Sequence, residues 1–572
     1  MSIAKALDAH QRADALEQLG AGELDVLVVG GGIVGVGAAL DAVTRGLRVG
    51  LVEQRDLASG TSSRSSKLVH GGLRYLEMFD FALVKEALEE RGLLLTRLAP
   101  HLVRPVPFLY PLEHAWERPY VGAGIALYDG MAMTGKYDMG VPKHKHVFRK
   151  QLARMAPDIR TDDMHGAIRY YDCLVDDARL VMTIARTAAN NGAHVATRTK
   201  VVAFLREGDA VVGARVRDLE GDREIEVRAK VVINAAGVWT DEVQDLIGGK
   251  AQLDVDASKG IHLVVPKDRI RSECGFITKT EKSVLFVIPW GQFWIIGTTD
   301  TAWDLDLAHP AASKADIDYL LGHVNRLLKD PLDHRDVIGV WAGLRPLLKA
   351  VGKQGESNGG ETTKLSREHT VANPVPGLVL VAGGKLTTYR VMARDAVDHA
   401  IREFDATPRS ITDRVPLMGA WGFETRTNQR VALSRSSGLD IGMVDHLLGR
   451  YGGLVDELLA LIHQRPELAE PLPGAEHYLK VEVLYAVTHE GARHLDDVLA
   501  RRTRVSIETF DRGISAARPA AELMAEALGW DEAQLEDEVD HYLRRVEAER
   551  QSQLMPTDQE ADEARVKAPD IV

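Results

Sequence analysis

Cysteine is scarce in this sequence, with Cys173 and Cys274 as the only two among 572 residues. They lie far apart and form no C-x-x-C pair, so neither a zinc site nor a redox disulfide is expected, and a reducing compartment is indicated. Long apolar runs are also missing, because residues 26–40, the longest uncharged one, are too few to span a bilayer. Acidic Glu23 and Asp25 precede this run, where a signal peptide would be basic. Surface attachment to a membrane stays open, since it needs only an amphipathic or basic patch.

An excess of positive charge is the third absence. The formal net charge of −13 at pH 7 argues against nucleic-acid binding, because nucleic-acid-binding proteins carry a basic face. Hydrophobic residues make up 45% of the chain and charged residues 27%, which is ordinary for a soluble globular protein. The length indicates two or three domains.

What is present, first of all, is a complete βαβ pattern near the N-terminus. Residues 25–29 are an apolar run of strand length, and glycines with the spacing G-x-G-x-x-G follow. Residues 33–45 have helical spacing, and residues 48–52 predict a second strand that ends at Glu53. A carboxylate at that position binds the hydroxyls of a ribose.

Each of the three glycines has a mechanical role in this pattern. Gly30 permits the tight turn, Gly32 lets the backbone approach a pyrophosphate, and Gly35 lets the helix pack closely on the strand. The helix N-terminus presents free N–H groups to the phosphates. The pattern therefore predicts dinucleotide binding, with a plain βαβ turn as the alternative.

The remaining chain predicts two sheets and a helical domain. Residues 194–228 alternate as a β-meander, and residues 230–237 are a buried strand that returns to the first sheet. Residues 252–299 alternate again and predict a second, mostly antiparallel sheet, while residues 378–384 give one more core strand. After about residue 408 strand signals vanish. The expected fold class is α/β with α+β mixing: a Rossmann-like nucleotide-binding domain, an antiparallel-sheet substrate domain and a C-terminal helical domain.

Domain boundaries follow from these patterns. The final segment is polar, contains Pro556 and Pro569 and has few apolar anchors, so it is expected to be disordered. The expected domains are a discontinuous nucleotide-binding domain (20–104, 165–250 and 373–405), a substrate domain (105–164 and 251–372), a helical domain (406–550) and a disordered tail (551–572).

Four segments place basic residues beside glycines or aromatic residues. They are HGGLRY at 70–75, KGIH at 259–262, GLRP at 343–346 and GGKLTTYR at 383–390. Arginine in such surroundings needs an anionic partner and suits bidentate recognition of phosphate or carboxylate. Taken singly, each arginine is as well explained by a salt bridge. The first segment belongs to a hydroxyl-rich loop, residues 57–75, that is placed to wrap a cofactor.

The sequence resembles the FAD-dependent glycerol-3-phosphate dehydrogenases, the respiratory enzyme family within the larger group of glycine/D-amino-acid oxidase-like flavoproteins. The matching segments run in family order from about residue 25 to 392. They are VVGGGIVGVGAALDAVTRGL, TSSRSSKLVHGGLRYLE, YYDCLVDDARL, NAAGVW, KGIHLVVP, VIPW, IIGTTD, GLRPL and GGKLTTYR. HGGLRY together with GGKLTTYR is far more specific than the glycine fingerprint.

The resemblance implies FAD as the cofactor and no metal. Gly30, Gly32, Gly35 and Glu53 would hold the ADP half. A helix that begins at residues 385–387 would place its positive end at the pyrimidine side of the flavin and stabilise the anion of the reduced form. The other expected cofactor residues are Thr61, Ser62, Ser66, Lys67, His70, Gly71, Gly237, Gly384, Leu386 and Thr387.

The implied reaction is oxidation of sn-glycerol 3-phosphate to dihydroxyacetone phosphate, in which a base removes the C2 hydroxyl proton and hydride passes from C2 to flavin N5. His262 is the expected base, because imidazole has a suitable pKa. His70 competes for this role, and His262 is alternatively a strand histidine satisfied by the backbone. The expected catalytic cations are Arg345, Lys385 and Arg74. The expected substrate-binding residues are Arg74, Tyr75, Arg345, Arg367 and Lys385, with Arg367 dependent on the alignment across the insertion at 349–363.

The resemblance also implies a quinone as electron acceptor, and hence attachment to a membrane surface. The expected location is cytoplasmic, peripherally bound to the inner face of the cytoplasmic membrane. Residues 119–133, with Tyr120, Ile125, Leu127 and Tyr128 among their apolar members, and the basic residues 143–154 are candidate lipid contacts. A core helix and a solvated basic face are the alternatives. The identity of the quinone and the oligomeric state stay open, with a homodimer as one candidate.

Three other functions are weighed against this one. A glycerol-3-phosphate oxidase would share the phosphate arginines and release H2O2, but such oxidases usually carry a larger insertion in the substrate domain. A non-catalytic flavin-binding scaffold would have no need of Arg74, Arg345, Lys385 and His262 together. A nicotinamide-linked enzyme is disfavoured, because the loop at residues 57–75 resembles one that wraps a flavin.

Overall fold

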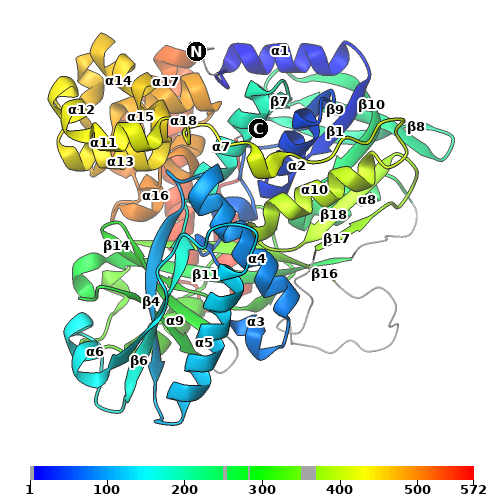
Figure 1. The fold of residues 1–572 in the computed structure, drawn as a ribbon. Coiled ribbons are helices and arrows are strands. Elements are labelled where there is room, and N and C mark those ends of the chain that lie inside the picture. Colours follow the sequence, from blue (N-terminus) through cyan, green and yellow to red (C-terminus); the bar gives the residue numbers. More distant parts are fainter. Residues whose placement is uncertain (1–4, 249–253, 281–283, 349–368, 572) are drawn as a thin grey trace.

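The computed structural model describes residues 5–248, 254–280, 284–348 and 369–571. Two large sheets lie one above the other in Figure 1, and a helical domain packs beside them. The expected mixed α/β fold class is therefore confirmed. Across the described ranges, no helix is both long enough and apolar enough to cross a bilayer.

The first sheet is built around the predicted βαβ unit. Strands β18, β10, β1, β2 and β7 are parallel neighbours, β17 is antiparallel to β18, and the β8–β9 hairpin continues β10 as the predicted meander. Its strands are β1 Leu24–Val29, β2 Val49–Val52, β7 His194–Ala196, β8 Thr199–Glu207, β9 Ala210–Asp218, β10 Arg223–Asn234, β17 His369–Ala372 and β18 Leu378–Gly383.

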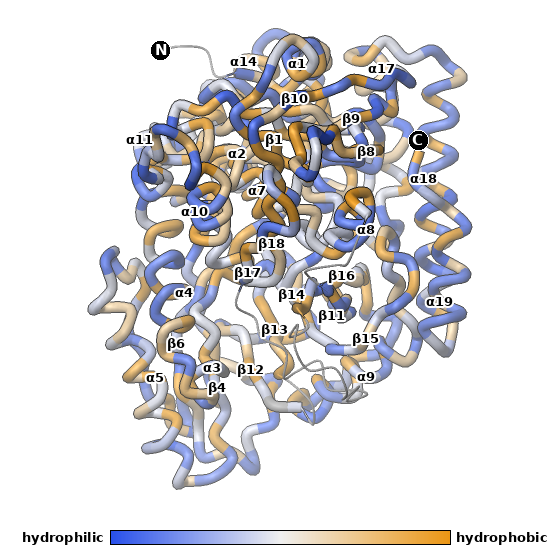
Figure 2. The backbone as a smooth tube through the Cα atoms, turned by 90° about the vertical axis from the view of Figure 1, so that its right-hand side faces the viewer, coloured by the Kyte–Doolittle hydropathy of each residue, from blue (hydrophilic) through white to orange (hydrophobic). Residues whose placement is uncertain are grey.

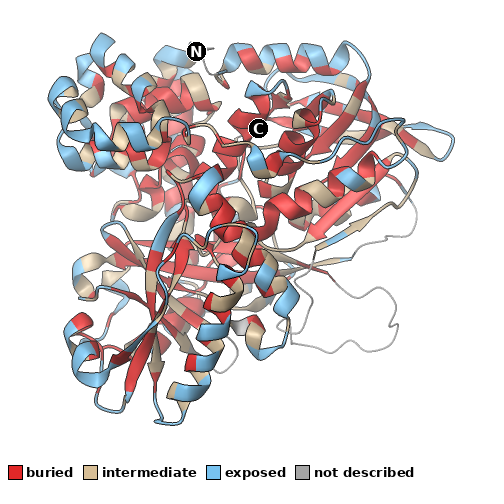
Figure 3. Ribbon diagram, viewed as in Figure 1, coloured by how far each residue is buried: buried red, intermediate tan, exposed pale blue. Residues whose placement is uncertain are grey.

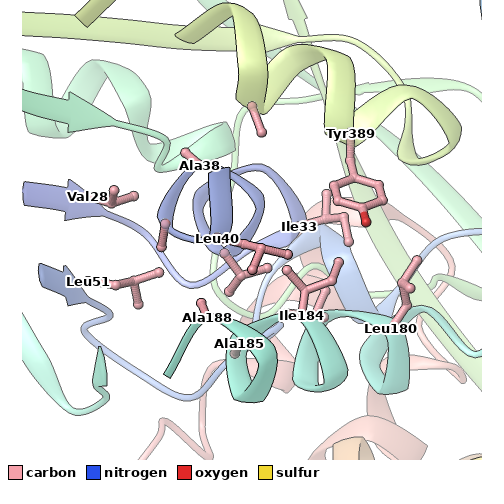
Figure 4. Close-up of a cluster of buried hydrophobic side chains, with 14 of the residues drawn as sticks. Val28, Ile33, Ala38, Leu40, Leu51, Leu180, Ile184, Ala185, Ala188 and Tyr389 are labelled. Carbon is pink, nitrogen blue, oxygen red and sulfur yellow. The ribbon is translucent and has the colours of Figure 1, made fainter. Parts of the chain in front are cut away.

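Helix α2, Ile33–Thr44, is the centre of the largest hydrophobic core. It packs between α7 (Asp177–Asn190) and α10 (Tyr389–Ala400), and Figure 4 shows Ile33 and Leu40 beside Leu180 and Ile184 of α7. Nearly every side of α2 is covered, so the helix is almost entirely apolar, and its charged residue Asp41 is buried in an ion pair with Arg45. Each fully buried Leu or Ile there contributes about 1.5–3 kcal/mol to stability.

The other face of the first sheet is covered by α1, Ala9–Gly20, and by the meander, which share a second core. Figure 2 shows apolar segments concentrated in α2, α7 and the strands, whereas α18 is mainly hydrophilic. The first sheet is therefore buried on both faces, as a mostly parallel sheet has to be.

The second sheet is mostly antiparallel, as expected. Strand β11 pairs with β14, β15 and β16, so three separate parts of the chain meet along it. Its strands are β3 Leu68–Val69, β4 Arg104–Leu112, β5 Lys145–Phe148, β6 Gly166–Leu174, β11 Val255–Pro266, β12 Gly275–Lys279, β13 Val284–Trp290, β14 Phe293–Gly297, β15 Thr301–Trp303 and β16 Gly339–Leu348. Its helices are α3 Arg74–Glu77, α4 Phe81–Leu93, α5 Glu117–Met133, α6 Arg149–Met155 and α9 Lys314–Asn325.

Three strands lie in a different sheet from the one their expected domain implies. Strand β3, at 68–69, was expected in the nucleotide-binding domain but pairs with β6 in the second sheet. Strand β6, at 166–174, was expected in the nucleotide-binding domain but pairs with β4 and β5 in the second sheet. Strand β17, at 369–372, was expected in the substrate domain but pairs with β18 in the first. These strands lie where the chain passes from one sheet to the other. The amino-acid composition changes little there, so only the pairing partner shows to which sheet a strand belongs.

The C-terminal region is helical as expected, with one exception. Strands β19 Pro471–Leu472 and β20 Ala475–Leu479 form a hairpin that the loss of strand signals after residue 408 did not predict. Its helices are α11 Phe423–Asn428, α12 Arg430–Ser437, α13 Ile441–Tyr451, α14 Val455–Gln464, α15 Lys480–Glu490, α16 Val505–Glu508, α17 Ile514–Leu528 and α18 Glu532–Ser552.

The expected disorder of residues 551–572 is wrong for the described part. Helix α19, Asp558–Arg565, follows α18 and packs back on the substrate domain, with Ala561 fully buried. Its anchors are charges, because the buried Lys259 ammonium lies 2.6 Å from both Asp558 and Asp316. The anionic partner expected for the KGIH segment is thus supplied by the chain itself. We call residues 553–571 the C-terminal tail.

We expect Asp558→Ala to release this tail locally. Losing a hydrogen bond to a charged group costs about 1.5–3 kcal/mol, so the tail should open roughly tenfold more often and be cleaved correspondingly faster in limited proteolysis. Glu563→Ala, on the exposed side of α19, is the matched control. Equal cleavage rates for the two variants would show that the Lys259 contact does not hold the tail.

Candidate active site

A cavity of about 470 Å³ lies between the two sheets. Its walls come from the carboxyl ends of β1, β10 and β18 on one side and from β11 and β16 on the other. The volume is in the usual range for ligand pockets. Ligands in open α/β sheets bind at the carboxyl ends of the strands, so this cavity is the candidate active site.

The predicted glycine turn opens into this cavity. Gly30 has φ +111°, and a side chain there would collide with the backbone at Ala235. A side chain on Gly35 would collide with the Gly30 carbonyl, which is why helix and strand can pack so closely only with glycine. Gly30 and Gly32 line the cavity, whereas Gly35 packs behind them. The tight turn expected at Gly30 and the close packing expected at Gly35 are therefore both present.

Glu53 lies beside this turn and lines the cavity. Its carboxylate accepts hydrogen bonds from the N–H of Gly31 at 2.6 Å and of Arg55 at 2.8 Å. Burial raises the pKa of Glu53, while these two hydrogen bonds lower it. At the start of α2, the Ile33 N–H donates to Ser62 Oγ at 2.9 Å. Acid, hydroxyl and helix N-terminus therefore converge where an ADP group was predicted.

A second helix start closes the opposite end of the cavity. After β18 the chain turns through Gly383 and Gly384, both with positive φ, and begins a short helix at Leu386 that continues as α10. Gly384, Lys385 and Leu386 line the cavity. Thr387 lies behind it, where its hydroxyl accepts a hydrogen bond from the His70 N–H at 3.0 Å and donates one to the His70 carbonyl. Thr387 thus fixes the HGGLRY loop.

His262 reaches the same cavity from β11. Its ring stacks on Trp341 at 4.8 Å with the planes 10° apart, and its Nε2 lies 2.8 Å from Ser66 Oγ. Its Nδ1 is buried and makes no hydrogen bond within the described part of the chain. Burial, with Arg345 and Lys67 nearby, holds the pKa of His262 well below its usual value. The imidazole is therefore neutral near pH 7 and can accept a proton.

Arg345 reaches the cavity from β16, the strand next to β11. One terminal nitrogen donates to Thr298 Oγ1 at 3.1 Å and to the Thr299 carbonyl at 3.0 Å. Asp300 lies 3.4 Å from the other terminal nitrogen. The guanidinium is thus held in one orientation at the cavity wall, as an anion-binding residue needs to be.

Lys385 is a further cation of the cavity wall, and its ammonium lies 3.6 Å from the ring centre of Tyr75. Tyr75 is buried behind it, so it supports Lys385 instead of lining the cavity. Arg74 begins α3, but its side chain lies outside the described residues. Arg367 and the insertion at 349–363 also lie outside them.

Two other predicted cofactor residues do not line the cavity. The Lys67 ammonium is buried 2.8 Å from Asp177 and also donates to the Ser63 carbonyl, so the expectation that it contacts the flavin or its phosphates is not met. Gly71 is buried and donates to the hydroxyl of Tyr128 at 2.8 Å. The predicted residues Thr61, Ser62, Ser66, His70 and Gly237 do line it.

Several lining or supporting residues were missed by the sequence interpretation. Trp341, which stacks on His262, comes from β16, whose register no local pattern fixes, whereas Asp300, beside Arg345, follows β14 and is the last residue of the recognised segment IIGTTD. Trp239, the last residue of the NAAGVW segment, and Glu242, three residues further on, line the cavity. That segment was recognised, and the aromatic residue and the acid that come after its glycine were the available signal.

The residues present fit FAD. At one end the cavity has the glycine turn and Glu53, an acid placed to bind ribose hydroxyls. At the other end it has a second helix N-terminus, and Ser66, His70 and His262 also line it. This combination of groups suits a dinucleotide whose two halves need different partners.

Comparisons with known proteins agree with this geometry. A family model described as "FAD dependent oxidoreductase" matches residues 25–390, and one described as "C-terminal domain of alpha-glycerophosphate oxidase" matches residues 410–535. The chain is 55% identical over 569 residues to glycerol-3-phosphate dehydrogenase 2 of Mycobacterium tuberculosis, covering 99% of this chain and 95% of that protein. It is 36% identical over 542 residues to the mitochondrial glycerol-3-phosphate dehydrogenase of Homo sapiens, covering 91% and 72%.

Solved structures give the same picture. The glycerol-3-phosphate dehydrogenase of Bacillus halodurans, solved in complex with FAD, superimposes with a TM-score of 0.77 at 30% identity and covers 96% of this chain and 99% of that one. The L-alpha-glycerophosphate oxidase of Mycoplasma pneumoniae, at a TM-score of 0.53 and 19% identity, shares the fold over 68% of this chain.

Proposed function

Because the chain belongs to the family of FAD-dependent glycerol-3-phosphate dehydrogenases, we propose that it oxidises sn-glycerol 3-phosphate to dihydroxyacetone phosphate. The observation that supports this most directly is that His262, Arg345 and Lys385 line one cavity together with the glycine turn and Glu53. A base, two cations and a nucleotide site are what the oxidation of a phosphorylated alcohol requires.

Bound FAD supplies the acceptor for the hydride that leaves C2 of the substrate. Gly30, Gly32, Glu53 and Ser62 would hold its ADP half, and Gly384 to Leu386 would face the flavin. The protein's own part in the reaction is to bind the phosphate, orient C2 and take up the proton of the C2 hydroxyl.

His262 is the base that we propose for this proton. Its neutral form has one free lone pair, and stacking on Trp341 together with the Ser66 contact fixes the ring plane. If Ser66 donates to Nε2, the proton-accepting position is shared with the hydroxyl; if Ser66 accepts, Nδ1 is the acceptor. In the first case the substrate proton passes to the Ser66 oxygen while the serine proton passes to Nε2; in the second case the substrate hydroxyl has to lie beside Nδ1.

Arg345 and Lys385 are the groups that we propose for the substrate phosphate. The guanidinium is held in one orientation by Thr298 and Asp300, which suits a fork-shaped contact with phosphate oxygens, and Lys385 adds a point charge. The same charges would stabilise negative charge that develops on the C2 oxygen.

The test is an anaerobic titration of the flavin-loaded protein with glycerol 3-phosphate. Bleaching of the oxidised flavin that is reversed quickly by a quinone analogue and slowly by air supports the proposal. Rapid reversal by air would indicate an oxidase. Absence of bleaching would show that the cavity serves another substrate.

We also propose a quinone as the acceptor and the surface of the cytoplasmic membrane as the place of reaction. The support is one apolar surface on the substrate domain. Trp116, directly before helix α5, and three residues of the helix, Tyr120, Leu127 and Met133, are exposed, with fractions of 63, 63, 46 and 54%. Ile125 and Tyr128, on its other face, belong to the core, so the core-helix alternative holds for that face alone.

Two further groups extend this surface. Met78, Phe79 and Phe81 are exposed where α3 meets α4, which packs against α5. Lys145, Arg149 and Lys150 lie at β5 and α6, next to α5, because Arg118 of α5 stacks on exposed Phe148. Figure 3 shows exposed positions along α5 and α6. Apolar side chains flanked by lysine and arginine suit an anionic lipid surface.

We expect the double variant Tyr120→Glu, Leu127→Glu to lose binding to anionic lipid vesicles by about tenfold or more, because burying one such side chain is worth about 1.5–3 kcal/mol. Cosedimentation measures the binding, and turnover with a soluble dye should not change. Ile441→Glu is the matched control, since Ile441 is 44% exposed on α13, which belongs to the helical domain. Unchanged vesicle binding of the double variant would exclude α5 as the lipid contact.

A further inference from the structure

A second cavity of about 120 Å³ lies where three parts of the chain meet: the hydroxyl-rich loop at residues 57–75, which we call the flavin loop, the helical domain and the C-terminal tail. Arg64 comes from the loop at 57–75, Arg501 and Arg504 from the helical domain, Arg545 from α18 and Arg565 from α19. Neither the family resemblance nor the proposed reaction gives this cavity a role.

Its lining is strongly basic. Seven arginines line it, against three carboxylates, Asp496, Glu549 and Asp570. These acids already have partners: Asp570 pairs with Arg55 at 2.9 Å, and Asp496 with Arg501 and Arg545 at 2.8 Å each. Glu549 pairs with Arg545 at 2.5 Å.

Two of the other arginines are neutralised from outside the cavity. Arg504 pairs with Asp176 and Asp177 at 2.5 Å each. Arg198 pairs with Asp497 at 3.2 Å. Of the seven arginines in the lining, Arg64 and Arg565 remain to be accounted for.

Arg64 and Arg565 have little compensation for their charge. Arg64 donates to the Ala308 carbonyl at 3.0 Å and makes no ion pair with any described residue. Arg565 donates to the Ala568 carbonyl and to His309, and its nearest carboxylate is Glu549, at 3.7 Å and already shared with Arg545. Burial and the neighbouring Arg565, Arg501 and Arg55 lower the pKa of Arg64 to about 10.

His309 and His494 do not balance the positive charges of Arg64 and Arg565. Burial, with Arg565 nearby, lowers the pKa of His309 to about 4, so this imidazole is neutral and accepts from Arg565. Although burial favours the neutral form of His494, hydrogen bonds to Glu220 and Glu538 raise its pKa to about 9. His494 is therefore positively charged, and Glu220 and Glu538 balance its charge.

The size of the cavity limits which anions can balance the charges of the two guanidiniums. A volume of about 120 Å³ holds a few water-sized groups, and it lies below the range of pockets for nucleotides or drug-sized ligands. Guanidinium forks match the oxygens of phosphate and related tetrahedral oxyanions.

We propose that this cavity is a binding site for a small oxyanion of the phosphate class, held between Arg64 and Arg565. Because one arginine belongs to the flavin loop and the other to the tail, the bound ion connects these two segments. Arg55, Ser59 and Arg64 line both this cavity and the active-site cavity, so occupancy of one stabilises the walls of the other.

The test uses the flavin-loaded protein and radiolabelled orthophosphate in equilibrium dialysis at constant ionic strength. We expect one saturable site that excess glycerol 3-phosphate does not displace. Arg565→Gln should weaken it by about tenfold or more, since a charged hydrogen bond is worth about 1.5–3 kcal/mol. Arg565→Lys, which keeps the charge but loses the fork, should fall between. Arg335→Gln, an exposed arginine paired with Asp333, is the control and should bind as the wild type does.

Two outcomes would overturn the proposal. One is orthophosphate binding that glycerol 3-phosphate displaces completely, since the ion would then occupy the active-site cavity. The other is equal binding by Arg565→Gln and the wild type. If Arg565→Gln does not retain flavin, the decision rests on Arg565→Lys and on the melting temperature of the wild type, which orthophosphate should raise and potassium chloride of equal ionic strength should not.

Discussion

Replacing His262 with asparagine should lower the rate of anaerobic flavin reduction by glycerol 3-phosphate by about 10²- to 10⁴-fold, the usual contribution of a general base. Asparagine keeps a polar group near Ser66 and fills part of the ring's volume against Trp341. Flavin content and substrate affinity should therefore change little. Stopped-flow absorbance measures the rate at saturating substrate.

The control for this variant is His70→Asn, because His70 lines the same cavity and was the competing candidate for the base. A large loss with His70→Asn and a small one with His262→Asn would reverse the assignment. Equal losses would indicate that both substitutions disturb the cavity instead of removing a base.

The pH dependence gives an independent check on His262. Burial and the nearby Arg345 and Lys67 hold its pKa well below the usual value, which is about 6.5. A base works in its deprotonated form, so activity is present above the pKa and is lost as pH falls through it. The acid limb of kcat/KM should therefore lie clearly below about pH 6.5 in the wild type. A limb at or above that value would contradict the buried, neutral imidazole.

Replacing Arg345 with methionine should be the other severe change. Truncating one partner of a buried charge pair costs about 2–5 kcal/mol, which corresponds to a loss of roughly 30- to 5,000-fold in kcat/KM. The loss should appear mainly as a higher KM, because a phosphate contact is made in the ground state as well as in the transition state. Initial rates with a soluble dye as acceptor measure both constants.

Arg345→Lys distinguishes charge from geometry. Lysine keeps the positive charge but cannot reproduce the contacts of the guanidinium with Thr298 and Thr299. We expect it to recover only part of the loss. Arg335→Met, on the surface beside Asp333, should behave as the wild type. A normal KM for Arg345→Met would remove Arg345 from the phosphate site.

The parts of this protein that could be predicted from sequence are those whose structure is determined by residues close together in the chain. The glycine turn, α2 and Glu53 are close in sequence, and backbone geometry alone requires glycine at positions 30 and 35. The helix start after Gly384 is equally local. These segments carry the nucleotide site, so the site could be placed before any tertiary contact was known.

Two of the errors concern charged residues whose partners are distant in sequence. Lys67 belongs to a loop that suggests phosphate binding, but its partner Asp177 lies 110 residues away and no local pattern reveals it. The tail has few apolar residues, and it is held by Asp558 against Lys259, 299 residues distant. Polar composition predicts disorder only when such pairs are absent.

The order of the strands in the first sheet also has a consequence for how the chain is made. Strand β1 ends at residue 29, β10 lies beside it, and β18, on the other side of β10, begins only at residue 378. At a synthesis rate of 5–20 residues per second, β18 leaves the ribosome on the order of 20–70 s after β1. During that time the second sheet, whose strands all lie between residues 68 and 348, can begin to form, whereas the first has an open edge at β10. The wall of the cofactor pocket that β18 provides is therefore completed late, and flavin loading should follow translation instead of guiding it.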